Sequence, residues 1–361
     1  MIIVVGAGPA GLAVARELGR RGLACRVLER HTIGHSWGQH YDGLRLHTLK
    51  QVSALPGLPM PAGFPDFPTA EQLRDYLRDY ARLFQVDITE EAEVRCATPS
   101  AAGWRLETSA GAVEAEWLVA ATGIWSKPFC PQLPGHEQFG GAVIHSSEYR
   151  NAAPYRGRRV LVVGAGNSGA EIALDLCAHG VETAISVRSG VAFAGLPRSP
   201  ARERAVAWLF RSLPRPLGGL LLRRRNFAAQ GLPLPAGSLL DAYPVVGYAL
   251  PEAAARGQVA VYPAVARLLP EGAWFSDGRL ADFDAIILAT GYRPALDFVA
   301  HALHRDERGR PRVDRRWRAL GARRLSCVGF RYPATEGWLQ GIGRVARQAA
   351  DGIAERLALA G

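Results

Sequence analysis

The stretch that decides the fold opens the chain: Met1-Ile2-Ile3-Val4-Val5-Gly6-Ala7-Gly8-Pro9-Ala10-Gly11. Its four apolar residues Ile2 to Val5 predict a buried parallel strand. The glycines follow the spacing GxGxxG. Gly6 allows a tight turn, Gly8 lets the backbone approach a pyrophosphate, and Gly11 lets the next helix pack closely on the sheet. The stretch therefore predicts the start of a dinucleotide-binding unit.

The residues after this turn supply the other parts of such a unit. A helix is expected from about Pro9 to Arg21, with the positive end of its dipole directed at the phosphates. The strand Ala24 to Leu28 then ends in Glu29. A carboxylate at this place binds ribose hydroxyls. Because strand, helix and acid accompany the glycines, we favour a nucleotide site over a strand–turn–helix without a ligand.

Composition limits the class of protein. A length of 361 residues suggests about two domains, and 48% apolar residues suffice for a large core. The first residues form a strand and not a secretory signal, and no apolar run is long enough to span a membrane. The five scattered cysteines include no CxxC pair. This favours a reducing compartment, taken as the cytoplasm, and argues against a zinc site or other metal centre.

The net charge of +10 raises the question of anionic partners. No recognised nucleic-acid module accompanies it, so we attribute it to anionic dinucleotides or to a preference for arginine codons. Residues 202–227 mix apolar residues with arginines. We favour a helical insertion or substrate lid over a membrane-surface contact, because Pro214 and Pro216 interrupt any long amphipathic helix. A homodimer stays open.

The segments after Glu29 have distinct patterns. Residues 34–51 are rich in Gly, His and aromatic residues and are expected to form a loop crossing the cofactor site. Thr69 predicts the N-cap of a helix over 70–84, with Gln72 completing a capping box. Three stretches alternate well enough to form a small sheet. They are 86–96, 104–108 and 113–119.

The opening pattern returns at Arg159-Val160-Leu161-Val162-Val163-Gly164-Ala165-Gly166-Asn167-Ser168-Gly169. The following strand, Ala184 to Val187, ends in Arg188 and not in an acid. An acid favours a free ribose 2′-hydroxyl, whereas an arginine accommodates a 2′-phosphate. The first unit therefore suits FAD and the second suits NADPH.

Two strands that run into Thr-Gly turns, at Thr122-Gly123 and Thr290-Gly291, predict the crossings between domains. The expected fold is α/β with two Rossmann-like domains, the NADPH domain inserted in the FAD domain. The FAD domain comprises 1–153 and 290–361, and the NADPH domain 154–289 with a helical insertion near 200–245. A last helix begins near Leu339-Gln340 and can direct its N-terminus at the flavin.

Further residues resemble a known family, the class B flavin-dependent monooxygenases. The fingerprint FxGxxxHxxxY is matched by Phe139, Gly141, His145 and Tyr149, just before the second glycine motif. Other stretches resemble the YUCCA-like branch and related short bacterial enzymes. They are 41–51, 64–69, 164–171 and 187–189. The resemblance covers essentially the whole chain.

The resemblance implies an enzyme that uses NADPH, FAD and O2 and acts through a flavin 4a-hydroperoxide on a small organic substrate. N- or S-oxygenation, Baeyer–Villiger oxygenation and oxidative decarboxylation of a 2-oxo acid are the reaction types in view. The N/S-oxygenating members carry Asn where His47 falls, so amine oxidation is less favoured. The alternatives are an FAD/NAD(P)H-dependent reductase, against which the missing CxxC speaks, and a non-enzymatic flavoprotein regulator.

The expected site residues divide between the two cofactors. We place His47 in the active site as the candidate catalytic group, Trp37 against the flavin, and His145 in a structural contact at the interdomain connection. On the FAD side the expected residues are Gly6, Gly8, Pro9, Ala10, Gly11, Glu29, Arg30, Trp37, Leu46, His47, Val94, Thr122, Gly123, Leu339 and Gln340. On the NADPH side they are Gly164, Gly166, Asn167, Ser168, Gly169, Arg188, Ser189, Thr290 and Gly291.

Overall fold

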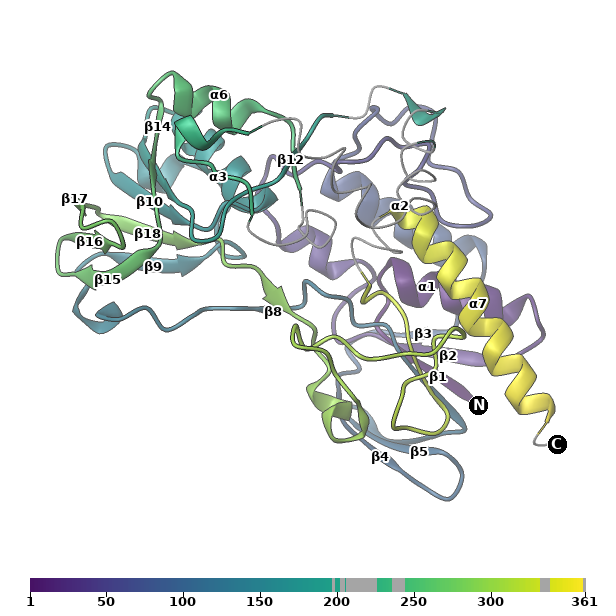
Figure 1. The fold of residues 1–361 in the computed structure, drawn as a ribbon. Helices are drawn as coiled ribbons and strands as arrows, with labels where there is room; N and C mark the ends of the chain where they lie inside the picture. The colour runs from purple at the N-terminus through teal and green to yellow at the C-terminus, as the bar shows by residue number, and fades with distance from the viewer. Residues whose placement is uncertain (197–198, 202–204, 206–225, 236–243, 332–337, 360–361) are drawn as a thin grey trace. The chain divides into compact units, whose positions relative to one another are not determined.

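The computed structural model describes residues 1–196, 199–201, 205, 226–235, 244–331 and 338–359. By internal contacts the chain divides into two compact units (Figure 1). Unit 1 comprises Met1–Gln39, Thr48–Lys127 and Tyr292–Gly361, and unit 2 comprises His40–His47 and Pro128–Gly291. Each unit contains a five-stranded parallel sheet, which confirms the expected α/β fold class with two Rossmann-like domains.

The sheet of unit 1 is built around the strand that opens the chain. Its strand order is β20-β7-β1-β2-β3, and every neighbouring pair is parallel. The central strand β1 is buried along its whole length, as its β-branched sequence predicts. The strands are β1 (Ile2–Val5), β2 (Cys25–Leu28), β3 (Ile88–Thr89), β7 (Trp117–Ala120) and β20 (Leu325–Cys327).

In the described part of unit 1, three helices and a small antiparallel sheet accompany the main sheet. The helices are α1 (Pro9–Gly19), α2 (Ala70–Leu83) and α7 (Leu339–Ala358), with 3-10 turns η1 (His35–Gln39) and η5 (Asp297–Ala302). The small sheet is β4 (Val94–Pro99), β5 (Trp104–Thr108) and β6 (Gly111–Ala115). The predicted capping box of α2 is confirmed. Thr69 Oγ1 accepts from the Gln72 N–H at 3.1 Å, and the Gln72 side chain accepts from the Thr69 N–H at 3.0 Å.

The prediction of one strand each over 86–96 and 113–119 is wrong, because each stretch is divided between two strands. The stretch 86–96 is divided: β3 joins the main sheet beside β2, and Glu91 turns the chain with a φ of 54° before β4 begins. The stretch 113–119 is divided in the same way between β6 and β7. The alternating pattern did not mark these breaks because the residues on both sides of each break favour strands.

Helices α1 and α7 pack side by side (Figure 1). An ionic cluster around a buried carboxylate of α1 joins them. The side chain of Glu17 on α1 is fully buried. Its two oxygens lie 2.5 Å from Arg16 Nη1 and 2.9 Å from Arg21 Nη1. Arg21 also reaches across to Asp351 of α7 at 2.6 Å. This ionic cluster ties the cofactor-side helix to the C-terminal helix.

Unit 2 repeats the arrangement of unit 1. Its sheet order is β14-β11-β10-β18-β9, again all parallel. These strands are β9 (Ala142–His145), β10 (Arg159–Val163), β11 (Glu182–Ser186), β14 (Val259–Tyr262) and β18 (Ala285–Leu288). The residues of β10 alternate between two cores, one with α3 (Asn167–Ala178) and α6 (Ala249–Ala255), the other with a three-stranded meander.

The meander and several short elements complete unit 2. The meander consists of β15 (Val265–Leu269), β16 (Gly272–Phe275) and β17 (Leu280–Asp282), and β12 (Phe193–Ala194) pairs with β13 (Val245–Val246). The 3-10 turns are η2 (His136–Gln138), η3 (Ala153–Tyr155) and η4 (Ala228–Gln230). At the crossings, β8 (Lys127–Pro128) pairs with β19 (Tyr292–Arg293).

The units differ from the expected domain boundaries at three places, the smallest of them residues 290–291, which group with unit 2. Residues 128–153 group with unit 2, because they contain β9, an edge strand of its sheet. Residues 40–47 also group with unit 2, although the chain on both sides belongs to unit 1. Most of the insertion expected near 200–245, including most of 202–227, lies outside the described residues. No helix among the described residues is long and apolar enough to cross a membrane.

Candidate functional site: two dinucleotide cradles

The first glycine turn has the geometry that its spacing predicts. Gly6 has a φ of 106°, and a Cβ on it would lie 2.7 Å from the Ala121 carbonyl oxygen. A Cβ on Gly11 would lie 1.9 Å from the Gly6 carbonyl oxygen. A Cβ on Gly8 would meet no atom within 4 Å. Gly6 and Gly11 are thus required by the fold itself, whereas Gly8 faces open space at the N-terminus of α1.

Glu29 lies against this turn from the end of β2. Its Oε2 accepts the Ala7 N–H at 2.7 Å, and its Oε1 accepts the His31 N–H at 3.0 Å. Two backbone donors fix the orientation of the carboxylate, and each oxygen keeps a lone pair for a further donor. The carboxylate is therefore held beside the glycine turn, as binding of an adenosine ribose requires.

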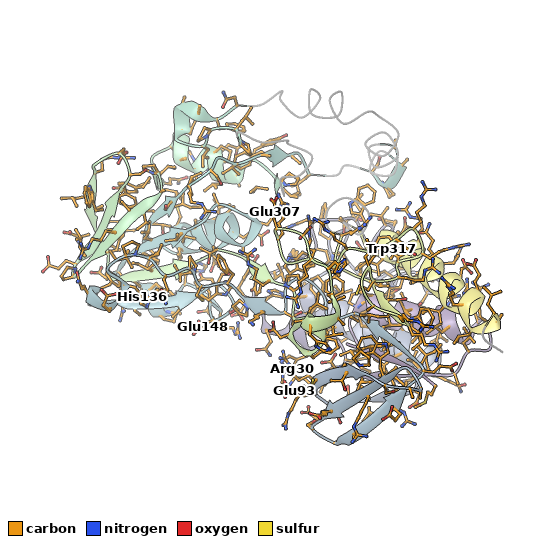
Figure 2. All side chains as sticks on the ribbon, turned by 60° about the horizontal axis from the view of Figure 1, so that its bottom comes forward. Arg30, Glu93, His136, Glu148, Glu307 and Trp317 are labelled. Carbon is orange, nitrogen blue, oxygen red and sulfur yellow. The ribbon has the colours of Figure 1, made fainter. Side chains whose placement is uncertain are left out.

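Other residues expected on the FAD side lie around the same edge of the sheet in unit 1. The Ala92 N–H bonds to the Glu29 carbonyl at 2.8 Å, which brings the start of β4 at Val94 next to Glu29. Arg30 follows Glu29 and is exposed (Figure 2). Thr122 lies two residues beyond the carboxyl-terminal end of β7, and its Oγ1 donates to the Ala295 carbonyl at 2.9 Å.

Three further residues expected on the FAD side belong to other segments of unit 1. The Trp37 ring is half-buried and meets Trp125 edge to face, with 6.3 Å between ring centroids. Gln340, in the first turn of α7, donates from Nε2 to the Gln51 carbonyl at 3.1 Å. Leu339 begins the helix and is half-buried.

The second glycine turn matches the first in its geometry. Gly164 also has a φ of 106°, and a Cβ on it would lie 2.5 Å from the Ala289 carbonyl oxygen. A Cβ on Gly169 would lie 1.9 Å from the Gly164 carbonyl oxygen, and one on Gly166 would meet nothing within 4 Å. Unit 2 therefore carries a second turn of this kind, at the N-terminus of α3. We call each glycine turn, together with the N-terminus of the helix that follows it, a cradle: the first lies at α1 and the second at α3.

Of the residues expected to contact NADPH, some are exposed and one makes side-chain hydrogen bonds within the protein. Arg188 and Ser189 are exposed and follow β11 after Val187, at the carboxyl edge where the 2′-phosphate of NADPH is expected. The Asn167 side chain is engaged within the protein: Nδ2 donates to the Pro244 carbonyl at 3.1 Å, and Oδ1 accepts the Val246 N–H at 2.9 Å. Asn167 thereby fastens β13 to the first turn of α3.

The fingerprint residues pack within unit 2. A Cβ on Gly141 would lie 2.4 Å from the Asp284 carbonyl oxygen and 2.8 Å from the Phe139 ring, so only glycine fits there. Tyr149 is buried, and its hydroxyl donates to Asp175 of α3. Burial and this hydrogen bond raise the pKa of Tyr149. The fingerprint is a set of packing contacts around β9.

His145 joins this strand to the second crossing. It is buried, and its Nε2 lies 3.0 Å from the Gly291 carbonyl oxygen, to which it must donate. Its Nδ1 then accepts the Ser147 N–H at 3.1 Å. Burial lowers the pKa of His145, against the opposing effects of Gly291 and Glu148. Beside it, Thr290 Oγ1 donates to the Phe129 carbonyl at 2.5 Å.

The segment 40–47 is fastened to helix α3. The Tyr41 hydroxyl donates to Glu171 Oε2 at 2.5 Å, and His47 Nε2 bonds to Glu171 Oε1. Leu46 and Tyr41 are buried. Burial and the charge of Arg150 lower the pKa of His40 to about 4, although Glu171 acts in the opposite direction. The sequence predicted His47 as a site residue but did not single out Glu171. The only indication for Glu171 was its place on the helix that follows the second GxGxxG turn.

The two cradles fit two dinucleotides. In each, an open position with extended backbone, Gly8 or Gly166, precedes a helix whose first N–H groups have no partner within the helix. In the first unit the strand after the glycine helix is followed by the fixed carboxylate of Glu29. In the second unit the corresponding strand is followed by the exposed Arg188. Among the described residues no group of His, Cys, Asp and Glu could hold a metal ion.

Comparison with known proteins agrees with this geometry. The chain matches the pyridine nucleotide-disulphide oxidoreductase family over residues 3–195. The rice (Oryza sativa subsp. japonica) protein indole-3-pyruvate monooxygenase YUCCA4 is 34% identical over 391 residues, covering 98% of this chain and 87% of its own. Indole-3-pyruvate monooxygenase YUCCA8 of Oryza sativa subsp. indica is 37% identical over 390 residues, covering 98% and 90%.

The chain belongs to the class B flavin-dependent monooxygenases, in their YUCCA-like branch. A solved structure agrees: the flavin-containing monooxygenase of Stenotrophomonas maltophilia superposes with a TM-score of 0.78 at 26% identity, covering 99% of this chain and 98% of that one. This class B monooxygenase is thus an oxidoreductase that depends on FAD and NADPH and uses O2 with a small organic substrate. All five of its cysteines are described and none forms a disulfide.

Proposed function

We propose that this class B monooxygenase oxidatively decarboxylates an aromatic 2-oxo acid of the indole-3-pyruvate class. The observation that carries the proposal is the similarity to two curated indole-3-pyruvate monooxygenases along 98% of the chain. The His47–Glu171 pair supports it, because the N/S-oxygenating members carry Asn where His47 falls. The balanced reaction converts the 2-oxo acid, O2, NADPH and a proton into the acid shortened by one carbon, CO2, NADP⁺ and water.

In this proposal the two cradles hold the two cofactors. The N–H groups at the start of α1 would receive the pyrophosphate of FAD, and Glu29 would accept a ribose hydroxyl. The start of α3 would receive the pyrophosphate of NADPH, and Arg188 its 2′-phosphate. FAD held in the first cradle would supply the redox chemistry, namely acceptance of hydride from NADPH and activation of O2. The protein orients the cofactors, keeps water away and, through His47, supplies an N–H whose direction Glu171 fixes.

The substrate proposal is tested by measuring O2 uptake with a panel of compounds. The purified enzyme with NADPH is given indole-3-pyruvate, phenylpyruvate, a tertiary amine, a sulfide and a cyclic ketone. We expect substrate-dependent O2 uptake with the 2-oxo acids, matched one for one by CO2. Stoichiometric oxygenation of the amine, sulfide or ketone, with no CO2 from either 2-oxo acid, would contradict the proposal.

The role proposed for Arg188 predicts a change in cofactor preference. Arg188→Gln removes a guanidinium that would pair with the 2′-phosphate in a solvent-exposed site. The loss of such a charge-assisted contact costs about 1.5 kcal/mol, so the preference for NADPH over NADH should fall about tenfold. The measurement is kcat/KM for flavin reduction with each nucleotide. Arg256→Gln, at an exposed arginine after α6, is the matched control and should leave the ratio unchanged.

Two further proposals concern the cellular compartment and the oligomeric state. None of the five cysteines forms a disulfide, which favours a reducing compartment such as the cytoplasm. We also propose a homodimer, which sedimentation of the FAD-loaded protein tests directly: a single species of one-chain mass at all concentrations would contradict it.

A further inference from the structure

Segment 40–47 is the one part of the N-terminal third of the chain that groups with unit 2. Three sets of contacts hold it there. The Asp42 N–H donates to the Arg150 carbonyl at 3.0 Å, and Asn151 Nδ2 donates to Asp42 Oδ2 at 2.8 Å. The Tyr41 ring is buried and packs on Tyr149. The third set of contacts converges on one carboxylate, that of Glu171.

Both oxygens of Glu171 are used by this segment. Oε2 accepts the Tyr41 hydroxyl and Oε1 accepts from His47 Nε2. Because a carboxylate only accepts, these contacts place a proton on His47 Nε2 and orient the ring. The Glu171 and His47 side chains are 30% and 28% exposed, so the pair is only partly screened by solvent.

Glu171 lies on α3, the helix whose N-terminus forms part of the second cradle. It follows Asn167 by four residues on α3, so the two side chains share one face of the helix. Asn167 fastens β13, and Glu171 fastens segment 40–47. The first turns of α3 therefore carry the nucleotide cradle at Gly166 and the anchor of segment 40–47 at Glu171.

We propose that Glu171 is a positioning residue of the NADPH site, which acts by holding His47 and segment 40–47 on the nucleotide-binding helix. The proposal rests on the proposed placement of His47 beside the flavin, where the nicotinamide must come to deliver hydride. Segment 40–47 then contributes to binding the nicotinamide half of the nucleotide. The adenosine half is left to Gly166 and Arg188.

The test compares two ligands and two carboxylates. The ligands are NADP⁺ and 2′,5′-ADP, which lacks the nicotinamide half, and their Kd values are measured calorimetrically with the FAD-loaded enzyme. Glu171→Gln is compared with Asp175→Asn, one helical turn later. Asp175 is a matched control because it also pairs with a tyrosine hydroxyl and a histidine, Tyr149 and His179, but with nothing in segment 40–47.

We expect Glu171→Gln to weaken NADP⁺ binding about tenfold and 2′,5′-ADP binding by less than about twofold. Hydrogen exchange of the peptide covering 40–47 should quicken, and NADP⁺ should slow it in the parent but not in the variant. Tyr41→Phe, which removes one of the two bonds and keeps the carboxylate, should show a smaller effect of the same kind. Asp175→Asn should leave both Kd values within about twofold of the parent.

Two outcomes would overturn the proposal. An unchanged Kd for NADP⁺ in both Glu171→Gln and Tyr41→Phe would show that segment 40–47 does not sense the nicotinamide. Equal weakening of both ligands, matched by Asp175→Asn, would show a general loss of structure. Neither outcome touches the substrate proposal, which is decided by substrate-dependent O2 uptake of the unmutated enzyme.

Discussion

Replacing Gly8 with alanine is expected to leave the protein folded and to weaken FAD binding by at least about tenfold. A methyl group at this position meets no protein atom within 4 Å, and Gly8 has an extended backbone that alanine also adopts. Alanine at this N-cap position costs less than about 1 kcal/mol. The methyl group would occupy the space of the pyrophosphate, and overpacking of this kind costs about 1–3 kcal/mol.

The second cradle provides the matched variant. Gly166→Ala places a methyl group in equally open space, so it too should fold. This variant should keep its FAD and remain yellow but need at least about tenfold more NADPH for half-maximal flavin reduction. The paired result would assign one nucleotide to each turn. Equilibrium dialysis of FAD and anaerobic titration with NADPH make the measurements.

Two other glycines of α1 serve as controls. Gly19 is exposed at the end of the helix, where a methyl group also meets nothing, so Gly19→Ala should change neither stability nor FAD binding. Gly11→Ala should fail to fold properly, because its methyl group would lie 1.9 Å from the Gly6 carbonyl oxygen. If Gly8→Ala bound FAD as tightly as the parent, the first turn would not be the pyrophosphate site.

The second large effect concerns stability. Glu17→Gln should lower the free energy of unfolding by about 3 kcal/mol, because it leaves the arginines around a buried site without their counter-charge. Besides Arg16 and Arg21, Arg20 lies 3.6 Å and Arg347 3.9 Å from the Glu17 carboxylate. Denaturant unfolding of the FAD-loaded proteins measures the difference. Glu114→Gln, which breaks an exposed pair with Arg105, should cost less than about 1 kcal/mol.

This contribution depends on pH in a defined direction. Burial raises the pKa of Glu17, but the hydrogen bond from Arg21 and the charges of Arg16 and Arg20 outweigh it, so the pKa lies below its ordinary value. A carboxyl group whose pKa is lowered by folding stabilises the protein fully above its unfolded pKa, about 4.3. The stabilisation is lost as pH falls through the lower folded value. The difference between parent and Glu17→Gln should therefore shrink on acidification; a difference that grows would contradict this account.

Much of the fold could be predicted because local signals agreed with one another. The β-branched strands, the GxGxxG turns and the residue that ends each second strand all gave the same interpretation, and both five-stranded parallel sheets confirm it. The capping box at Thr69 was predicted from two residues because its hydrogen bonds are local. The assignment of single residues to FAD or NADPH contacts stays a prediction.

Features that depend on distant residues could not be predicted in this way. The attachment of segment 40–47 to Glu171 joins residues more than a hundred positions apart and has no periodic pattern. Trp317 offers a second example (Figure 2). It ends the turn that begins at Asp314 and has a φ of 62°. Gly309 ends a similar turn that begins at Asp306 and has a φ of 75°. Its indole is buried and donates to Gln348 of α7 at 2.9 Å, so tertiary contacts hold a conformation that tryptophan alone disfavours.

The visible absorbance of the purified protein, followed through one anaerobic reduction and one reoxidation, tests whether the first cradle binds FAD and the second binds NADPH. We expect a yellow protein that releases FAD and not FMN on denaturation. It should lose its flavin absorbance with NADPH faster than with NADH and regain it when O2 is admitted. A protein that binds no flavin when incubated with FAD, or whose bound flavin NADPH does not reduce, would contradict the assignment of the two cradles.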